Sequence, residues 1–280
     1  MGFEIEDHKL KGVTFQPTKK MGGRIIPKLI TNHYTAGSTF EGDFNTLFKR
    51  KNSVSAHLLV GRDAEVVQGV PFNRKAWHAG PSKYKHLKGI NNHSIGIELQ
   101  NMGYLKKVDQ FTYTNWNGTI KYSYQDIMRK GWTLQKHRHS RIGGGVYYWI
   151  EYTDKQLQVL EEITTALIEH YETIEYIVSH EEIDTRGWKT DPGPAFPMDR
   201  YRHLLSRRTD YIGESTGYYE VNASKLNVRK GPGISHEVIS QLSRNDMVMI
   251  IEGEEVEGWV QIKHGMTDIG WVYHKYIKPI

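Results

Sequence analysis

The sequence contains no cysteine, and it has no apolar run long enough to span a bilayer. Without cysteine the chain forms no disulfides, and a bound metal must be held by His and carboxylate side chains instead of thiolates. The N-terminus carries charges from Glu4 onward and lacks the uninterrupted apolar segment of a secretory signal. We therefore expect no signal peptide, no membrane insertion, and synthesis in the cytoplasm followed by action after release or export.

The charge balance is basic, with a formal net charge of +5 at pH 7. Such a charge favours an anionic partner, and nucleic acid, acidic lipid and an anionic wall polymer all qualify. No nucleic-acid-binding motif accompanies the basic residues, so we predict no nucleic-acid partner. The densest basic segment, residues 136–141, is interpreted as a solvated loop, because charge runs usually are.

Two patterns divide the 280 residues. Residues 1–212 alternate predicted strands with predicted helices, whereas residues 220–280 show short strands separated by turn residues. Residues 213–219 are polar and contain two glycines, which is typical of a linker. Within the first part, residues 103–152 are rich in aromatics, glycine and basic residues, with turn signals at Asn117-Gly118 and at residues 143–145. We interpret this segment as an insertion of hairpins and loops.

Four strands are predicted in the first part, because short apolar runs there end in polar residues. These strands cover residues 29–33, 56–60, 94–99 and 175–180. A short helix is predicted at residues 43–51. A longer one begins at Thr153, where the spacing to Gln156 is that of a capping box.

Five residues form the most informative set: His33, Glu98, His180, Lys189 and Asp191. Most of them lie at or just beyond the end of a predicted strand, where a rigid scaffold can present reactive groups. Two imidazoles and one carboxylate leave the fourth tetrahedral position of Zn²⁺ open for water, as in catalytic zinc sites. The sequence therefore predicts a zinc-dependent hydrolase.

Glu98 alternates with apolar neighbours, so its carboxylate points away from the apolar face of its strand. Gly96 shares its face and is expected to leave open space beside it. A carboxylate there is suited to take a proton from water and pass it to a leaving amine. Lys189, two residues before Asp191, can place an ammonium near a developing oxyanion.

Other histidines are interpreted as structural. His57 lies inside an apolar strand and is predicted to be a hydrogen-bonded core residue, and His93 to be a turn residue. The segment beginning at His180 starts like a His-Glu-x-x-His zinc-protease helix, but Asp184 stands where the second His belongs. That protease motif is therefore absent.

Four motifs together resemble the type-2 N-acetylmuramoyl-L-alanine amidases, a family that includes phage lysins, bacterial anhydromuramoyl-peptide amidases and peptidoglycan recognition proteins. They are Thr31-Asn32-His33-Tyr34-Thr35-Ala36-Gly37, Ala76-Trp77-His78-Ala79-Gly80, residues 91–98, and Ser179-His180 with Lys189-Thr190-Asp191-Pro192-Gly193. The resemblance implies an α/β (α+β) domain with a central mixed β-sheet flanked by helices.

The same resemblance implies roles for individual residues. His33, His180 and Asp191 are expected to bind Zn²⁺, with Glu98 as the acid/base and Lys189 steadying the transition state. Trp77 and His78 are expected to line the substrate groove. The substrate implied is bacterial peptidoglycan, cut between N-acetylmuramic acid and L-alanine.

The C-terminal part resembles bacterial SH3 domains, through residues 223–233, 258–262 and 270–272. This implies a small all-β barrel that binds the cell wall. Trp259 and Trp271 are expected to fill its core. Two other functions stay open: a receptor that binds peptidoglycan without cutting it, and a zinc endopeptidase that cuts within the wall peptide. An endolysin, an antibacterial toxin and a wall-remodelling enzyme share this layout, and the sequence does not indicate an oligomeric state.

Overall fold

The computed structural model describes residues 2–210, 218–251, 255–264 and 268–279. It divides into two compact units, Met1–Leu205 and Ser206–Ile280. Most of the predicted linker, residues 213–217, lies outside the described residues. Among the residues that are described, no helix has both the length and the apolar character needed to cross a membrane.

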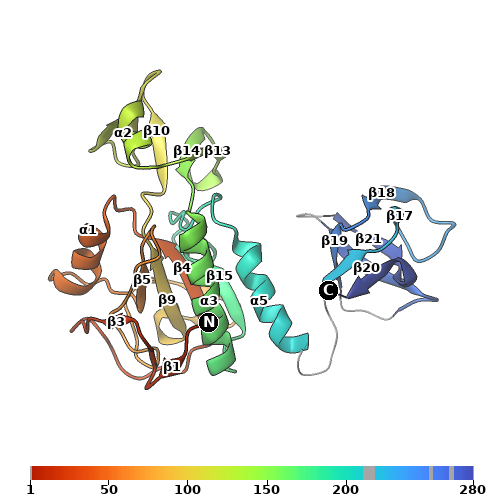
Figure 1. Ribbon diagram of the computed structural model, residues 1–280, viewed down its shortest axis with the longest axis horizontal. Helices are drawn as coiled ribbons and strands as arrows, with labels where there is room; N and C mark the ends of the chain where they lie inside the picture. Colours follow the sequence, from red (N-terminus) through yellow and green to blue (C-terminus); the bar gives the residue numbers. More distant parts are fainter. Residues whose placement is uncertain (1, 211–217, 252–254, 265–267, 280) are drawn as a thin grey trace. The chain divides into compact units, whose positions relative to one another are not determined.

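The first unit is built on a mixed sheet of six strands in the order β15-β4-β9-β5-β6-β3 (Figure 1). The strands are β3 (Thr14–Phe15), β4 (Leu29–Tyr34), β5 (Leu58–Val60), β6 (Val66–Gln68), β9 (Ser94–Leu99) and β15 (Tyr176–Ser179). β15, β4, β9 and β5 run parallel to one another, and β6 is antiparallel to β5. The predicted central mixed sheet is thereby confirmed.

One face of this sheet packs on the helices α3 (Asp154–His170) and α5 (Met198–Asp210). Ile30 of β4 and Ile95 of β9 meet Leu160 of α3 in this core, and all three are fully buried. Thr153 caps α3 as predicted, because its side chain accepts a hydrogen bond from the backbone N–H of Gln156. Gln156 itself donates to the carbonyl of Val60 and so ties the helix to the sheet.

The opposite face of the sheet carries the polar residues of the site. Successive side chains of a strand alternate between faces, so burial of Ile30 and Ile95 against α3 turns His33 and Glu98 the other way. Shorter elements flank this face. They are α1 (Phe40–Phe44) with a π-helical turn at Asn45–Lys49, α4 (His180–Ile183), and the small hairpin of β7 (Lys83–Tyr84) with β8 (Leu87–Lys88). A second small hairpin, β1 (Ile5–Glu6) with β2 (Lys9–Leu10), packs instead with α3 on the other face.

The segment after β9 forms a second, antiparallel sheet that extends beyond the end of the central one (Figure 1). Its elements are β10 (Tyr104–Lys107), β11 (Thr112–Asn115), β12 (Lys121–Ser123), α2 (Tyr124–Arg129), β13 (Leu134–Arg138) and β14 (Val146–Ile150). This insertion sheet has its own core, which includes Leu105 and Ile150. The predicted turns at Asn117-Gly118 and at residues 143–145 lie between its strands.

The described residues of the second unit from Tyr218 onward form a sheet of seven strands in the order β18-β17-β21-β20-β19-β16-β22. They are β16 (Tyr218–Val221), β17 (Lys225–Arg229), β18 (Val238–Ser243), β19 (Met247–Ile250), β20 (Trp259–His264), β21 (Asp268–Tyr273) and β22 (Ile277–Pro279). The expectation that Trp259 and Trp271 fill its core is wrong. Val260, Ile262 and Val272 are buried there, so the alternation of side chains turns both tryptophans toward the surface, where they are only half-buried.

Candidate metal centre

His33 and Glu98 are brought together by strand pairing. β4 and β9 run parallel in a register that makes His33 and Glu98 direct partners. Residues opposite each other in paired strands project to the same face. Two residues that are far apart in the sequence therefore stand side by side, on the face away from α3.

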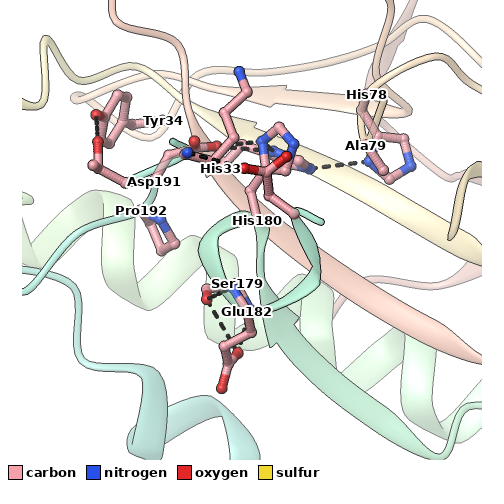
Figure 2. Close-up of polar contacts among 12 residues, drawn as sticks. His33, Tyr34, His78, Ala79, Ser179, His180, Glu182, Asp191 and Pro192 are labelled. Atoms are coloured by element: carbon pink, nitrogen blue, oxygen red, sulfur yellow. Dashed lines mark hydrogen bonds and ion pairs between the residues drawn. The ribbon is translucent and has the colours of Figure 1, made fainter. Parts of the chain in front are cut away.

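His180 is placed by a helix cap on the neighbouring strand. β15 pairs with the other edge of β4, and His180 is the first residue of α4, which follows it directly. Ser179 and Glu182 form a reciprocal capping box: the serine hydroxyl accepts from the Glu182 N–H, and the Ser179 N–H donates to the glutamate carboxylate (Figure 2). The cap fixes the direction in which α4 starts, and with it the position of the imidazole.

Asp191 comes from the loop after α4. The loop is fastened to that helix, because the backbone N–H of Glu181 donates to the carbonyl of Asp191 at 3.0 Å. A hydrogen bond also joins the loop to β4, since the Tyr34 hydroxyl and the Thr190 hydroxyl lie 2.6 Å apart (Figure 2). Both predicted histidines and the predicted aspartate thus reach one point from three separate segments.

Their ligand atoms converge closely (Figure 2). His33 Nδ1 lies 3.0 Å from His180 Nδ1 and 3.0 Å from Asp191 Oδ2, and His180 Nδ1 lies 2.8 Å from that same oxygen. All three residues are buried. Tetrahedral zinc with bonds of about 2.0 Å separates its ligand atoms by about 3.3 Å, so the spacing fits zinc after a small expansion.

The electrostatics of His33 and Asp191 agree with a cation site. Burial lowers the pKa of His33 to about 4, and the neighbouring His180 acts in the same direction. Burial alone would raise the pKa of Asp191, but His180 and His33 outweigh it and hold that pKa well below its usual range. Near neutral pH the site therefore offers a neutral His33 imidazole and an ionised carboxylate, the protonation states that zinc requires.

His78 lies behind His33, where it does not line a groove. Its Nδ1 is 3.0 Å from His33 Nε2, and its side chain is buried (Figure 2). With Nε2 donating to His78, the neutral His33 ring keeps its Nδ1 lone pair directed at Asp191 and His180. The prediction that His78 lines the substrate groove is replaced by this orienting contact.

Gly96 explains why His78 fits there. A Cβ built on Gly96 would lie 2.4 Å from Cγ of His78, so only glycine leaves room for the ring. The expectation of open space beside Gly96 is therefore wrong, because that space holds an imidazole. His57 is a fully buried structural residue, as predicted: its Nε2 donates to the carbonyl of Arg74 and its Nδ1 accepts from the N–H of Gly96.

Glu98 has the environment of a proton carrier. Its Oε2 is buried and has no hydrogen-bond partner in the part of the chain that the structure describes. Burial raises the pKa of Glu98 well above its usual range, the Asp191 and Asp43 carboxylates add to the rise, and the Lys189 ammonium opposes it. A carboxylate of this kind readily accepts and returns a proton.

Lys189 is positioned by Asp184, which sequence reasoning had noted only as the wrong residue for a zinc-protease helix. The buried carboxylate of Asp184 accepts the backbone N–H groups of Trp188 and Lys189 at 3.0 and 3.1 Å. These contacts fold the chain between α4 and Asp191 into a tight loop. Lys189 is thereby held on the rim of the site, two residues from a ligand.

A cavity of about 310 Å³ opens beside these groups. Four of the seven predicted site residues line it: Glu98, His180, Lys189 and Asp191. Neither Trp77 nor His78 is among its lining residues. Trp77 is instead half-exposed outside it, with the Lys75 ammonium 4.2 Å above its ring.

The basic segment at residues 136–141 is not simply solvated. His139 is buried, and its Nε2 lies 3.0 Å from a carboxylate oxygen of Glu181. Arg141 donates to the carbonyl of Lys189 at 3.0 Å. The interpretation as a solvated loop is therefore wrong for these two residues, because they anchor the insertion sheet to α4 and to the loop that carries Lys189 and Asp191.

Comparisons with known proteins identify the family of this chain. A family model described as N-acetylmuramoyl-L-alanine amidase matches residues 22–194, and one described as bacterial SH3 domain matches residues 224–278. The chain is 36% identical over 157 residues to 1,6-anhydro-N-acetylmuramyl-L-alanine amidase AmpD of Escherichia coli (strain K12), covering 56% of this chain and 61% of that protein. It thus spans less than two thirds of that relative.

A second relative is covered more fully. The chain is 33% identical over 193 residues to AmpD of Salmonella typhimurium (strain LT2), covering 68% of this chain and 75% of that one. A crystal structure of a Se-Met AmpD derivative aligns with a TM-score of 0.46 at 27% identity, covering 72% of this chain and 98% of that one. Since the amidase model matches more than half of its residues, the chain belongs to the N-acetylmuramoyl-L-alanine amidase family of zinc-dependent amide hydrolases and carries a bacterial SH3 domain.

Proposed function

We propose that this protein hydrolyses the amide between N-acetylmuramic acid and the L-alanine of the peptidoglycan stem peptide, with His33, His180 and Asp191 as its zinc ligands. The observation that carries the proposal is the convergence of these three donors within 3.0 Å of one another, with Glu98 on the adjoining strand facing the same cavity. Bound there, zinc polarises a carbonyl and lowers the pKa of water.

The chain's own residues supply the proton transfers. Glu98 takes the proton of the attacking water at its carboxylate and returns it to the leaving nitrogen, which departs as the amino group of L-alanine. The Lys189 ammonium stabilises the negative charge that grows on the carbonyl oxygen. His78 keeps the His33 ring oriented through its contact at 3.0 Å.

The test uses a defined muropeptide and the masses of its products. Cleavage at the proposed bond yields an intact stem peptide with a free L-alanine amino terminus and a sugar with a free lactyl carboxylate. Removal of zinc by a chelator should abolish the release, and added zinc should restore it. Binding without products indicates a receptor, and fragments cut inside the peptide indicate an endopeptidase; either result contradicts the proposal.

We also propose that the SH3 domain holds the enzyme on the wall. A cavity of about 460 Å³ on this unit is lined by the aromatic residues Trp259, Tyr273 and Tyr276 together with Lys225 and Arg229. The aromatic rings offer flat contact surfaces and the two cations suit the carboxylates of wall peptides. We infer that the protein reaches the wall after release or export, as an endolysin or another antimicrobial wall hydrolase does.

Pelleting of the full-length protein with purified wall measures this binding. Tyr276→Ala removes a ring that is 44% exposed and should lower the pelleted fraction several-fold, while hydrolysis of a soluble muropeptide stays unchanged. Val238→Ala, on the same unit but outside the cavity lining, is the matched control. Equal pelleting of wild type and Tyr276→Ala would contradict the proposal.

A further inference from the structure

The insertion sheet is part of the catalytic cavity. Three of its residues, Tyr104, Trp116 and Ile142, line the cavity together with Glu98 and Lys189. The cavity therefore has one wall made by the central sheet and another made by the insertion. This second wall is not accounted for by the zinc chemistry.

The insertion is firmly attached to the loops that hold the zinc ligands. Besides the contacts of His139 and Arg141, fully buried Trp149 of β14 packs directly on Gly193, where an added Cβ would lie 2.4 Å from its ring. At the start of the insertion, Gly103 lies against the ring of Tyr34, next to His33. A wall anchored at so many points can place a side chain with the accuracy that substrate recognition needs.

Trp116 is itself held in a defined position. It follows β11 directly, in the turn that leads to β12. Buried Asn115 closes this turn: its backbone N–H donates to the carbonyl of Ile120, and its side-chain oxygen accepts the N–H of Ile120. The turn thus presents Trp116 on a stiff support, and the residue nevertheless remains 48% exposed.

A second indole stands on the loop of Lys189. Trp188 also lines the cavity and is 59% exposed, with the Arg186 guanidinium 4.6 Å from its ring centre. Trp116 and Trp188 are thus two large, exposed aromatic side chains at one cavity, and together they offer apolar surface there. Exposed apolar surface of this kind marks a place for a ligand.

The charged groups of the cavity lining already have roles in the site. Of its described carboxylates, Asp191 is a proposed zinc ligand and Glu98 the proposed acid/base, and Lys189 is the ammonium assigned to the oxyanion. The exposed indoles of Trp116 and Trp188 are therefore left for an uncharged part of the substrate. A muramic acid ring whose lactyl group is in amide linkage is uncharged, and the C–H face of a sugar ring can pack flat on an indole.

We propose that Trp116 of the insertion and Trp188 of the Lys189 loop form a subsite for the uncharged sugar ring on the acyl side of the scissile amide. This makes Trp116 of the insertion a specificity-determining residue, and it rests on the proposed function. The stem peptide then leaves the cavity on a side that the two indoles do not line.

The test compares two substrates with the same scissile amide. One is an N-acetylmuramoyl peptide, and the other is a D-lactoyl peptide of identical sequence that lacks the sugar ring. Trp116→Ala should raise KM for the sugar-bearing substrate about 10-fold, equivalent to about 1.4 kcal/mol, with little change in kcat. On the lactoyl peptide, KM of Trp116→Ala should equal that of wild type. On the sugar-bearing substrate, KM of Trp116→Phe should lie between those of wild type and Trp116→Ala.

Phe111→Ala is the matched control, because Phe111 lies on the same insertion, is 62% exposed and is not among the cavity lining residues. Unchanged KM for Trp116→Ala, or an equal loss on both substrates, would overturn the subsite. A wild-type enzyme that cleaves neither substrate would instead overturn the proposed function. Thermal unfolding of each variant checks that the fold is kept.

Discussion

Glu98→Ala is expected to bind zinc as wild type does and to lose about 10²–10⁴-fold in kcat, the range that a general acid/base usually contributes. Its carboxylate is the group that carries the proton from water to the leaving nitrogen, yet it is not among the three converging donors. Zinc content by elemental analysis and turnover on a defined muropeptide measure the two properties separately.

Two companion variants sharpen this result. Glu98→Gln keeps the size of the side chain but cannot accept the proton, so its loss should be similar to that of Glu98→Ala.

Lys189→Ala should also retain zinc and lose about 10²–10³-fold in kcat, the usual effect of removing one group that stabilises an oxyanion. Lys88→Ala, an exposed lysine outside the cavity lining, should behave as wild type. Zinc loss in Glu98→Ala equal to that in a ligand variant would contradict the assignment.

His33→Ala is expected to lose both zinc and activity. Removal of one of three protein ligands leaves two donors, which cannot hold the ion in an open catalytic geometry. Asp191→Ala should behave in the same way, because its Oδ2 contacts both imidazoles. Stoichiometric zinc in wild type and almost none in the variants is the expected result of metal analysis after dialysis.

Reconstitution separates metal loss from unfolding. Wild type stripped by a chelator should regain turnover when zinc is added, whereas His33→Ala should not. His93→Ala is a suitable control, because His93 lies in a turn between a short helix and β9, outside the site. Full zinc content and normal turnover in His33→Ala would show that the ion is held elsewhere.

The main elements of the site could be predicted from the sequence, because they depend on local patterns. Alternation along residues 94–99 places Glu98 opposite to Ile95 and Ile97, whatever the rest of the chain does. The strand expected at residues 175–180 is likewise present, although β15 ends at Ser179 and His180 begins α4. Such patterns depend only on residues that are close in the sequence, so contacts with distant segments do not change them.

Other features depended on contacts between distant segments and could not be read locally. His78 lies in a motif with Trp77, but its ring direction is decided by the gap over Gly96 on another strand. His139 and Arg141 look like surface charges until Glu181 and the carbonyl of Lys189 are placed beside them. The insertion wall was missed for the same reason, since nothing near Trp116 in the sequence indicates what it faces.

The tryptophans of the SH3 domain are a different case, because the local alternation of side chains pointed to the correct answer and the prediction did not follow it. Val260 and Ile262 alternate with Trp259 along one strand, so burying the aliphatic residues requires the indole to face outward. Trp271 stands beside Val272 in the same way. Large aromatic size alone was therefore a poor guide to the core.

The most direct test of the central claim is anomalous diffraction at the zinc edge from crystals of the zinc-loaded protein. One peak is expected, bonded to His33 Nδ1, His180 Nδ1 and Asp191 Oδ2, with the Glu98 carboxylate facing the remaining position. A peak bound by any other set of side chains, or none in crystals whose zinc content is stoichiometric, would contradict the account.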